Sequence, residues 1–147
     1  MAVIRFSAEH INAAARIEAE TFAEPWSAEA LKLLTTAVYP SFAICEGDAL
    51  VAYFGTSLSL DELQILTVAV DAKARRRGFA GELMGALDEY AKANGIVMIS
   101  LEVRESNVAA ISLYEKYGYA RAGLRKNFYR FPTENALVMI KNFDNER

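Results

Sequence analysis

Apolar residues alternate along some stretches of the chain with a period of two and recur along others with a helical period, which predicts strands and helices in turn. The strand pattern covers residues 3–6, 41–46, 50–57, 63–70, 97–104, 120–129 and 136–142. Four helices are predicted. The first two cover residues 8–22 and 28–34, the third follows the loop 75–81 and ends at Asn94-Gly95, and the fourth runs from its cap at Asn107 to Lys116. The pattern predicts an α/β domain with a mixed sheet of about seven strands and four helices.

Local signals set several boundaries of these elements. Ser27 stands three residues before Ala30, and Asn107 precedes an apolar helix, so each is placed to cap a helix N-terminus. Gly47-Asp48 separates two strands and predicts a hairpin turn, since both residues tolerate a positive φ. The first helix has only a moderate apolar stripe, made of Ile11, Ala14, Ala15, Ile17 and Glu18.

Residues 63–70 form the longest and most apolar strand, and they read as central because both faces are largely hydrophobic. A glycine-bearing loop and a helix follow, with Leu83, Met84, Leu87 and Ala91 on one stripe. This strand, loop and helix form the most informative unit of the sequence.

The loop places three arginines, Arg75, Arg76 and Arg77, directly before a helix N-terminus, where the helix dipole favours anions by about 0.3–1 kcal/mol. Gly78 and Gly81 allow a ligand to approach the free backbone N–H groups, as in a phosphate site. A solvated basic loop is the alternative interpretation. Neither Gly-Lys-Ser/Thr nor Gly-x-Gly-x-x-Gly is present, so a phosphorylated cofactor other than a nucleoside triphosphate or a dinucleotide is favoured.

Composition narrows the class of protein. A chain of 147 residues with 53% hydrophobic residues predicts one domain, residues 1–147, with an adequate core. The net charge of −3 argues against nucleic acid or an anionic membrane as partner. A single cysteine excludes an intrachain disulfide, and we find neither a membrane-spanning run nor a signal sequence, so we expect a soluble cytoplasmic protein. Cys45 and the lone His10 suggest no nucleophile pair, and no metal site is expected.

The motif Arg75-x-x-Gly78-x-Ala80 after an apolar strand resembles the signature Arg/Gln-x-x-Gly-x-Gly/Ala of the GCN5-related N-acetyltransferases. The neighbouring motifs resemble one branch of that family, the bacterial ribosomal-protein alanine acetyltransferases of the RimI type, and the likeness spans residues 22–139. The matching motifs are Pro25-Trp26-Ser27, Asp61-Glu62, Ala69-Val70-Asp71, Leu101-Glu102-Val103-Arg104, Ser106-Asn107, Ala109-Ala110, Leu113-Tyr114-Glu115, Gly118-Tyr119, Arg125-x-Asn127-x-Tyr129 and Ala136-Leu137-Val138-Met139.

The resemblance implies the acetyltransferase fold, acetyl-CoA as cosubstrate, and attack of an amine on the thioester without a covalent enzyme intermediate. By the same resemblance, Glu102 is the general base and Tyr114 the general acid. Residues matching the family's cofactor contacts are Val68, Ala69, Val70, Arg76, Arg77, Gly78, Phe79, Ala80, Gly81 and Asn107. The implied acceptor is the N-terminal α-amine of a ribosomal protein, in a groove to which we assign Trp26 and Tyr129, with Glu24 as a weaker candidate. We expect a monomer or a weak dimer.

Taken without the resemblance, each of these residues has a structural alternative. A strand carboxylate such as Glu102 most often faces solvent, Tyr114 is an ordinary aromatic anchor, and Asn107 is only a cap. The structural alternative for Trp26 is a side chain that packs against the protein rather than against a ligand. If the helix after Asn107 packs beside the end of strand 97–104, however, Glu102 and Tyr114 flank one cleft.

Two departures from the branch pattern are visible. Arg75 stands where the branch often has Gln, which is within the pattern of the wider family, and Phe128 replaces the first tyrosine of Asn-Tyr-Tyr. The second departure removes a hydroxyl on the acceptor side and so concerns peptide preference more than the chemistry. Two other functions stay open. One is an acetyltransferase acting on a lysine or a small-molecule amine, and the other is a non-catalytic coenzyme A-binding sensor.

Overall fold

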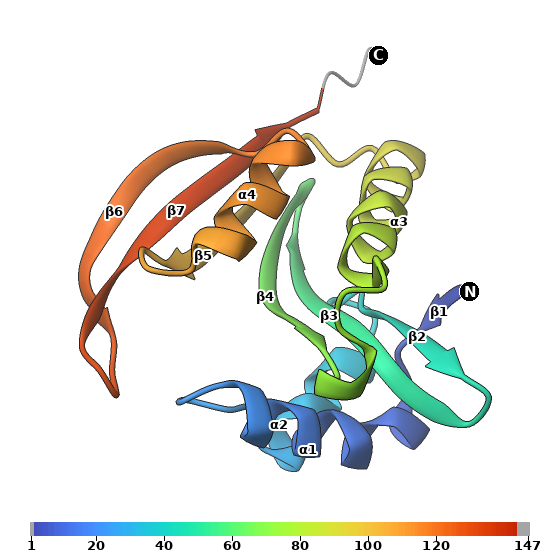
Figure 1. Ribbon diagram of the computed structural model, residues 1–147. Helices are drawn as coiled ribbons and strands as arrows, with labels where there is room; N and C mark the ends of the chain where they lie inside the picture. Colours follow the sequence, from blue (N-terminus) through green and yellow to red (C-terminus); the bar gives the residue numbers. More distant parts are fainter. Residues whose placement is uncertain (1, 144–147) are drawn as a thin grey trace.

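The computed structural model describes residues 2–143 and contains a sheet of seven strands with four α-helices (Figure 1). The strands are β1 (Val3–Arg5), β2 (Phe42–Glu46), β3 (Ala49–Ser59), β4 (Glu62–Val70), β5 (Met98–Arg104), β6 (Ala120–Tyr129) and β7 (Glu134–Asn142). The α-helices are α1 (Ile11–Thr21), α2 (Ala28–Leu31), α3 (Phe79–Ala93) and α4 (Val108–Lys116). Short 3-10 turns precede α1 and follow α2 and β4. The predicted fold class is confirmed.

The strand order across the sheet is β1-β2-β3-β4-β5-β7-β6, and β4 with β5 is the one parallel pair within residues 2–143. The predicted central position of β4 is therefore confirmed. Helix α3 forms the crossover that a parallel pair requires. This crossover places the N-terminus of α3 at the end of β4 from which the chain emerges.

A bulge in β4 explains why both of its faces are apolar. Gly55 pairs with Thr67 and Thr56 with Ile65, which leaves Leu66 as the extra residue. Before the bulge, Ile65 belongs to the core on the α3 side of the sheet, whereas Ala69 beyond it belongs to the core under α1. The bulge therefore changes which side chains of β4 face each helical layer.

Strands β4 and β5 pair over only three positions, from Glu62 opposite Met98 to Gln64 opposite Ser100. Beyond that point the strands diverge, as the gap between them in Figure 1 shows. The diverging ends carry residues 64–70 on one side and residues 101–104 on the other, and both sets line one cavity. The sheet is therefore open between its central strands β4 and β5.

Two buried cores lie on opposite faces of this sheet. The larger core joins α3 and α4 to the sheet and includes Leu83, Leu87 and Ile111. The smaller core joins α1 and α2 to the other face through side chains such as Ile17 and Leu31. The apolar stripe predicted for α3 is fully buried.

Most local signals act as the sequence predicts. Ser27 and Asn107 each accept a hydrogen bond from the backbone N–H three residues later, at 3.1 and 3.2 Å. Gly47, Gly95 and Gly118 adopt positive φ at the ends of their elements. Some strand boundaries differ slightly from the prediction. Strand β1 ends at Arg5, one residue earlier than predicted, and β7 begins at Glu134, two residues earlier than predicted.

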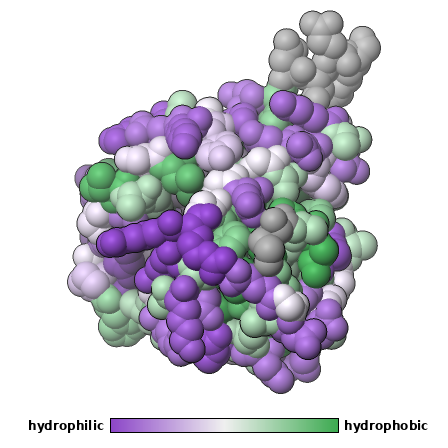
Figure 2. All heavy atoms as spheres, turned by 45° about the vertical axis from the view of Figure 1, so that its right-hand side comes forward, coloured by the Kyte–Doolittle hydropathy of each residue, from purple (hydrophilic) through white to green (hydrophobic). Residues whose placement is uncertain are grey.

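The surface of the side that bears α3 is mixed: hydrophilic side chains cover most of it, and hydrophobic ones form smaller areas between them (Figure 2). Among the helices of residues 2–143, none combines the length and the apolar character needed to cross a bilayer.

The contact between Gly55 of β3 and Leu34 leaves no room for a side chain on the glycine. A Cβ on Gly55 would lie 2.6 Å from Leu34 Cδ1 and 3.3 Å from its Cγ, and Leu34 is fully buried. We expect Gly55→Ala to lower the free energy of unfolding by about 1–3 kcal/mol, measured by urea denaturation. Leu34→Ala in the same chain should relieve part of this strain, so purely additive effects of the two changes would contradict the packing argument.

Candidate active site

The divergence of β4 and β5 opens a cavity of about 1020 Å³. Its walls come from the end of α1 and the segment after it, from β4, from the loop leading into α3, and from β5, α4 and the end of β6. Nearly all of the residues singled out by the sequence analysis line it. Those at the cavity are Trp26, Val68, Ala69, Val70, Arg76, Gly78, Phe79, Ala80, Gly81, Glu102, Asn107, Tyr114 and Tyr129.

The loop before α3 has the backbone geometry of an anion site. Gly78 is the N-cap of α3 with φ +82°, a conformation that favours glycine, and Arg76 also has a positive φ of +65°. The first helical bond runs from Glu82 N–H to Gly78 O at 3.1 Å, so the N–H groups of residues 79–81 have no partner within the helix. A helix N-terminus of this kind binds phosphate groups well.

The three arginines of this loop have different surroundings. Arg75 donates to Val70 O at 3.2 Å, and Arg76 forms no salt bridge within residues 2–143. Arg77 forms a salt bridge with Glu46, and its guanidinium lies 4.9 Å from the centre of the Phe79 ring. Arg77 is not among the residues that line the cavity, so the structure does not bring it to the site with Arg76.

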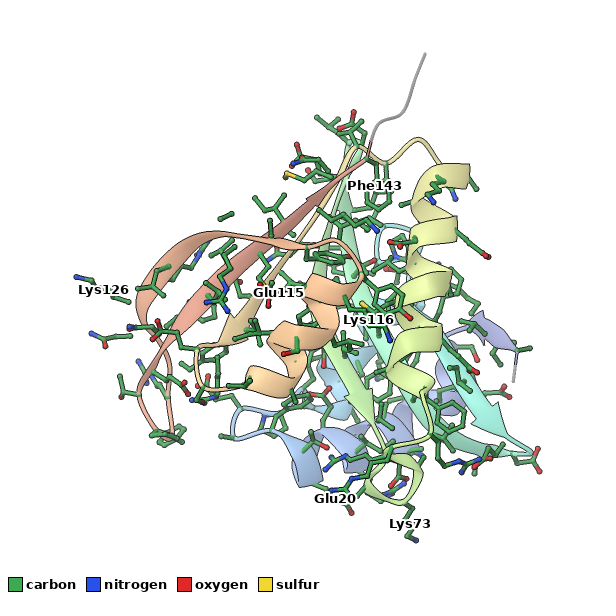
Figure 3. The ribbon with its side chains drawn as sticks, turned by 45° about the horizontal axis from the view of Figure 1, so that its top comes forward. Glu20, Lys73, Glu115, Lys116, Lys126 and Phe143 are labelled. Carbon is green, nitrogen blue, oxygen red and sulfur yellow. The ribbon has the colours of Figure 1, made fainter. Side chains whose placement is uncertain are left out.

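A further cation, which the sequence analysis missed, faces the same region. Lys116 in the last turn of α4 lines the cavity and lies between α4 and α3 in Figure 3. Its position at the end of a short helix gave no signal in the sequence. Lys116 and Arg76 therefore both line the cavity, the first from α4 and the second from the loop itself.

Glu102 lines the cavity from β5, and its side chain is only 15% exposed. Gln64 Nε2 donates to its Oε1 at 3.3 Å, and Arg125 Nε of β6 lies 2.7 Å from its Oε2. Oε2 is buried and accepts no hydrogen bond of good geometry within the described residues. The contact with Arg125 is therefore a salt bridge without a well-directed hydrogen bond. The Arg125 side chain itself is 62% exposed.

Tyr114 lines the cavity from α4 and is 8% exposed. Burial, together with the nearby Tyr129 hydroxyl, raises the pKa of Tyr114 to about 12. Burial also raises the pKa of Tyr129 to about 12, and the charge of Glu102 acts in the same direction. Both phenols therefore keep their protons at neutral pH.

The end of the cavity opposite the basic loop is formed by two segments far apart in sequence. The Trp26 side chain is half-buried there, and Glu24 Oε1 accepts a hydrogen bond from Arg130 N at 2.6 Å, which joins the segment after α1 to the turn between β6 and β7. Arg104 fastens this turn to β5 by donating to Arg130 O at 2.6 Å and to Pro132 O at 2.9 Å. Glu24 and Tyr129 thus both reach the wall that the sequence analysis assigned to them.

Other polar residues near the cavity carried no role in the sequence analysis. Gln64 and Arg125 touch Glu102, Arg104 holds the turn, and Glu18 is fully buried under the segment that contains Trp26. Glu18 gave a signal as a carboxylate in the apolar stripe of α1, and Arg104 and Arg125 stood in motifs that resemble the family without an assigned role. Gln64 gave no signal, because its partner lies on another strand.

Comparisons with known proteins agree with this geometry. Residues 11–119 match the model of the acetyltransferase (GNAT) family. The chain is 35% identical over 137 residues to the [ribosomal protein bS18]-alanine N-acetyltransferase of Salmonella typhimurium, covering 90% of this chain and 91% of that one. The enzyme of the same name from Escherichia coli K12 is 34% identical over 131 residues, with coverage of 86% and 87%.

Solved structures extend the comparison to three dimensions. The crystal structure of the ribosomal-protein-S18-alanine N-acetyltransferase from Escherichia coli superposes with a TM-score of 0.93 at 29% identity, over 99% of this chain and 96% of that one. An acetyl-CoA-bound acetyltransferase from Elizabethkingia anophelis shares the fold with a TM-score of 0.67 at 17% identity, over 72% and 77% of the two chains. With its fold, its divergent central strands and a family match over most of its length, the chain belongs to the acetyltransferase (GNAT) family and is an acetyl-CoA-dependent N-acetyltransferase.

Proposed function

We propose that this protein transfers the acetyl group of acetyl-CoA to the N-terminal α-amine of a protein, and that its acceptor is an alanine N-terminus of the ribosomal protein bS18 type. The observation that carries the proposal is that Glu102, Tyr114 and the basic loop before α3 line one cavity. The names of the two enzymes that are 34% and 35% identical support the choice of acceptor.

In this proposal the cofactor lies along the open edge of β4. Residues 68–70 are beyond the paired part of β4 and β5, so β5 does not use their backbone groups, and an extended pantetheine arm adds to the sheet there like a strand, with Val70 O already accepting from Arg75. The diphosphate lies on the N–H groups of residues 79–81, with Arg76 and Lys116 supplying positive charge. Asn107 caps α4 and also faces the cofactor.

Glu102 removes the proton of the acceptor amine, directly or through one water. The amine nitrogen attacks the thioester carbonyl, the new C–N bond forms, and the C–S bond breaks as the tetrahedral intermediate collapses. Gln64 fixes one oxygen of the Glu102 carboxylate, and the exposed Arg125 yields its place at the other oxygen to the incoming amine. The base is thus oriented before the acceptor arrives.

Tyr114 supplies the proton that the departing thiolate needs. A phenol with a pKa of about 12 is fully protonated at neutral pH, and its ring is fixed in the core against Tyr119, with the ring centres 5.9 Å apart. Transfer from this phenol to a thiolate of pKa near 8.5 is uphill, so the proton moves to the sulfur only as the C–S bond breaks and negative charge builds up there. Tyr114 then regains a proton from solvent, and Glu102 releases to solvent the proton that it took from the amine.

An α-amine is the acceptor that this site can use most readily. Deprotonation at pH 7 costs about 1–1.4 kcal/mol for an α-amine of pKa ~7.7–8.0, against about 4.6 kcal/mol for a lysine of pKa ~10.4.

Glu102→Gln tests the base. Because glutamine cannot take a proton, we expect kcat on an alanine-initiated peptide with the bS18 N-terminal sequence to fall by about 10²–10⁴-fold, while the Kd for acetyl-CoA changes little. Product is measured by mass spectrometry of the peptide and cofactor binding by calorimetry. Unchanged turnover would remove Glu102 from the mechanism, and a parent enzyme that leaves the bS18 peptide unmodified would refute the proposed acceptor.

Tyr114→Phe tests the acid. We expect the chemical step, measured by rapid quench, to slow by about 10²-fold or more, since the leaving group loses its proton donor. The raised pKa gives a second measurement: the difference in tyrosinate absorbance between the parent and Tyr114→Phe should appear only near pH 12. Because the pKa is higher in the folded state, the stabilisation from this proton is complete below pH ~10 and is lost as the pH rises towards 12. A variant as fast as the parent would require another donor.

Arg76→Ala tests the cofactor loop, with Arg77→Ala as the matched comparison. Arg76 lines the cavity without a salt bridge in the described chain, whereas Arg77 is bound to Glu46 outside it. We expect Arg76→Ala to weaken acetyl-CoA binding about 5- to 10-fold at low salt and less at high salt, and Arg77→Ala to have a smaller effect. Equal losses in the two variants would show that the loop acts by general charge rather than by contact.

A further inference from the structure

Glu18 is a fully buried carboxylate outside the proposed reaction centre. It lies in the last turn of α1, has 0% exposure, and forms no salt bridge within residues 2–143. Burying a carboxyl group without hydrogen-bond partners costs free energy, so its contacts must compensate for the burial. The contacts of Glu18 therefore indicate what it does.

The two oxygens of Glu18 have different partners. Oε2 accepts hydrogen bonds from two hydroxyls of the sheet, Tyr53 Oη at 2.6 Å and Thr67 Oγ1 at 2.7 Å. Oε1 accepts one from the backbone N–H of Trp26 at 2.9 Å. One oxygen is thus bound to β3 and β4, and the other holds the segment 22–27 that follows α1.

This segment forms the acceptor end of the cavity. Phe22, Ala23, Glu24 and Trp26 all line the cavity. It contains no regular secondary structure, so the sheet and the helices do not fix its backbone. Phe22 N–H bonds to Glu18 O, and the Phe22 and Trp26 side chains pack against the smaller core. Besides the Ser27 cap, side chains bind the backbone of the segment or tie it to other elements at two points: Glu18 Oε1 accepts from Trp26 N–H, and Glu24 Oε1 accepts from Arg130 N–H.

We propose that Glu18 is a positioning residue for the acceptor: its Oε1 sets the place of Trp26 and hence the width of the acceptor end of the cavity. The proposal rests on the proposed function, because it takes this end as the one where the peptide enters. Glu18 lines the cavity, but both of its carboxylate oxygens are bound to Tyr53, Thr67 and the Trp26 N–H. It acts through the Trp26 backbone, and its loss changes acceptor binding more than cofactor binding.

The chemistry of the partners separates this positioning role from a general contribution to stability. A hydroxyl can accept as well as donate, whereas a backbone N–H can only donate. In Glu18→Gln the amide NH2 group can therefore turn towards Tyr53 and Thr67 while the carbonyl oxygen still accepts from Trp26. Glu18→Met keeps about the same volume and loses all three bonds. Tyr53→Phe removes one bond to Oε2 and leaves the Trp26 contact intact.

The test compares these three variants in the full-length protein with the bS18 peptide and acetyl-CoA. We expect Glu18→Met to raise the KM for the peptide about 10-fold or more, with the KM for acetyl-CoA within about twofold of the parent. Glu18→Gln should keep the peptide KM within about threefold. Tyr53→Phe should lower Tm but leave the peptide KM within about twofold.

A second measurement does not depend on activity, because Trp26 is the only tryptophan of the chain. We expect Glu18→Met to shift the tryptophan emission to longer wavelength and to increase quenching by acrylamide, while Tyr53→Phe and Glu18→Gln keep the emission of the parent. Glu18→Asp, which keeps the charge but is shorter by one methylene, should resemble Glu18→Met in this measurement and provides the same test if Glu18→Met does not fold.

The outcomes that would overturn the proposal are specific. Equal changes of peptide KM in Glu18→Met and Tyr53→Phe, or an unchanged Trp26 emission in Glu18→Met and Glu18→Asp, would show that Glu18 contributes only to stability. A parent enzyme that does not acetylate the peptide would instead refute the proposed function, and the fluorescence of Trp26 would still decide the positioning role.

Discussion

The site depends on the short pairing between two central strands: β4 and β5 stay paired for only three positions and then separate. A fully paired parallel ladder would use the backbone groups of residues 68–70 in hydrogen bonds to β5 and would leave no space between the strands. The early divergence leaves those groups unpaired by β5 and opens the cavity towards α4. The bulge at Leu66 lies on the diverging part of β4 and divides its side chains between the two cores.

Side-chain hydrogen bonds hold the cavity where the sheet no longer does. Arg104 binds two carbonyl groups of the β6–β7 turn, Glu24 bridges from this turn to the segment after α1, and Glu18 fastens that segment from below. Each of these contacts satisfies backbone groups that irregular segments leave without a partner. The walls at the acceptor end are therefore fixed by a few polar side chains rather than by secondary structure.

The two groups assigned to proton transfer occupy different environments in the same cavity. Tyr114 lies in the apolar core between α4 and the sheet, where burial raises its pKa and keeps the phenol neutral. Glu102 lies among polar partners, with an amide on one oxygen and a guanidinium beside the other. Opposite environments of this kind allow one group to give a proton and the other to take one at the same pH.

The sequence by itself determined the elements whose causes are local. Helix caps at Ser27 and Asn107, the hairpin glycine at position 47 and the buried stripe of α3 depend on residues within a few positions of each other. Motif spacing also indicated the family and the basic loop, because a strand, a glycine-bearing turn and a helix N-terminus are contiguous in the chain.

Only the tertiary structure decided which of these residues meet. Arg77 follows Arg76 in the chain, yet it turns to Glu46, a residue of β2, and leaves the cavity. Arg125 lies beside Glu102 because β6 and β5 both flank β7, and Glu18 reaches Tyr53 and Thr67 because α1 crosses the sheet at that point. Such contacts join residues that are tens of positions apart, and the packing of whole elements, which no short sequence pattern encodes, sets their geometry.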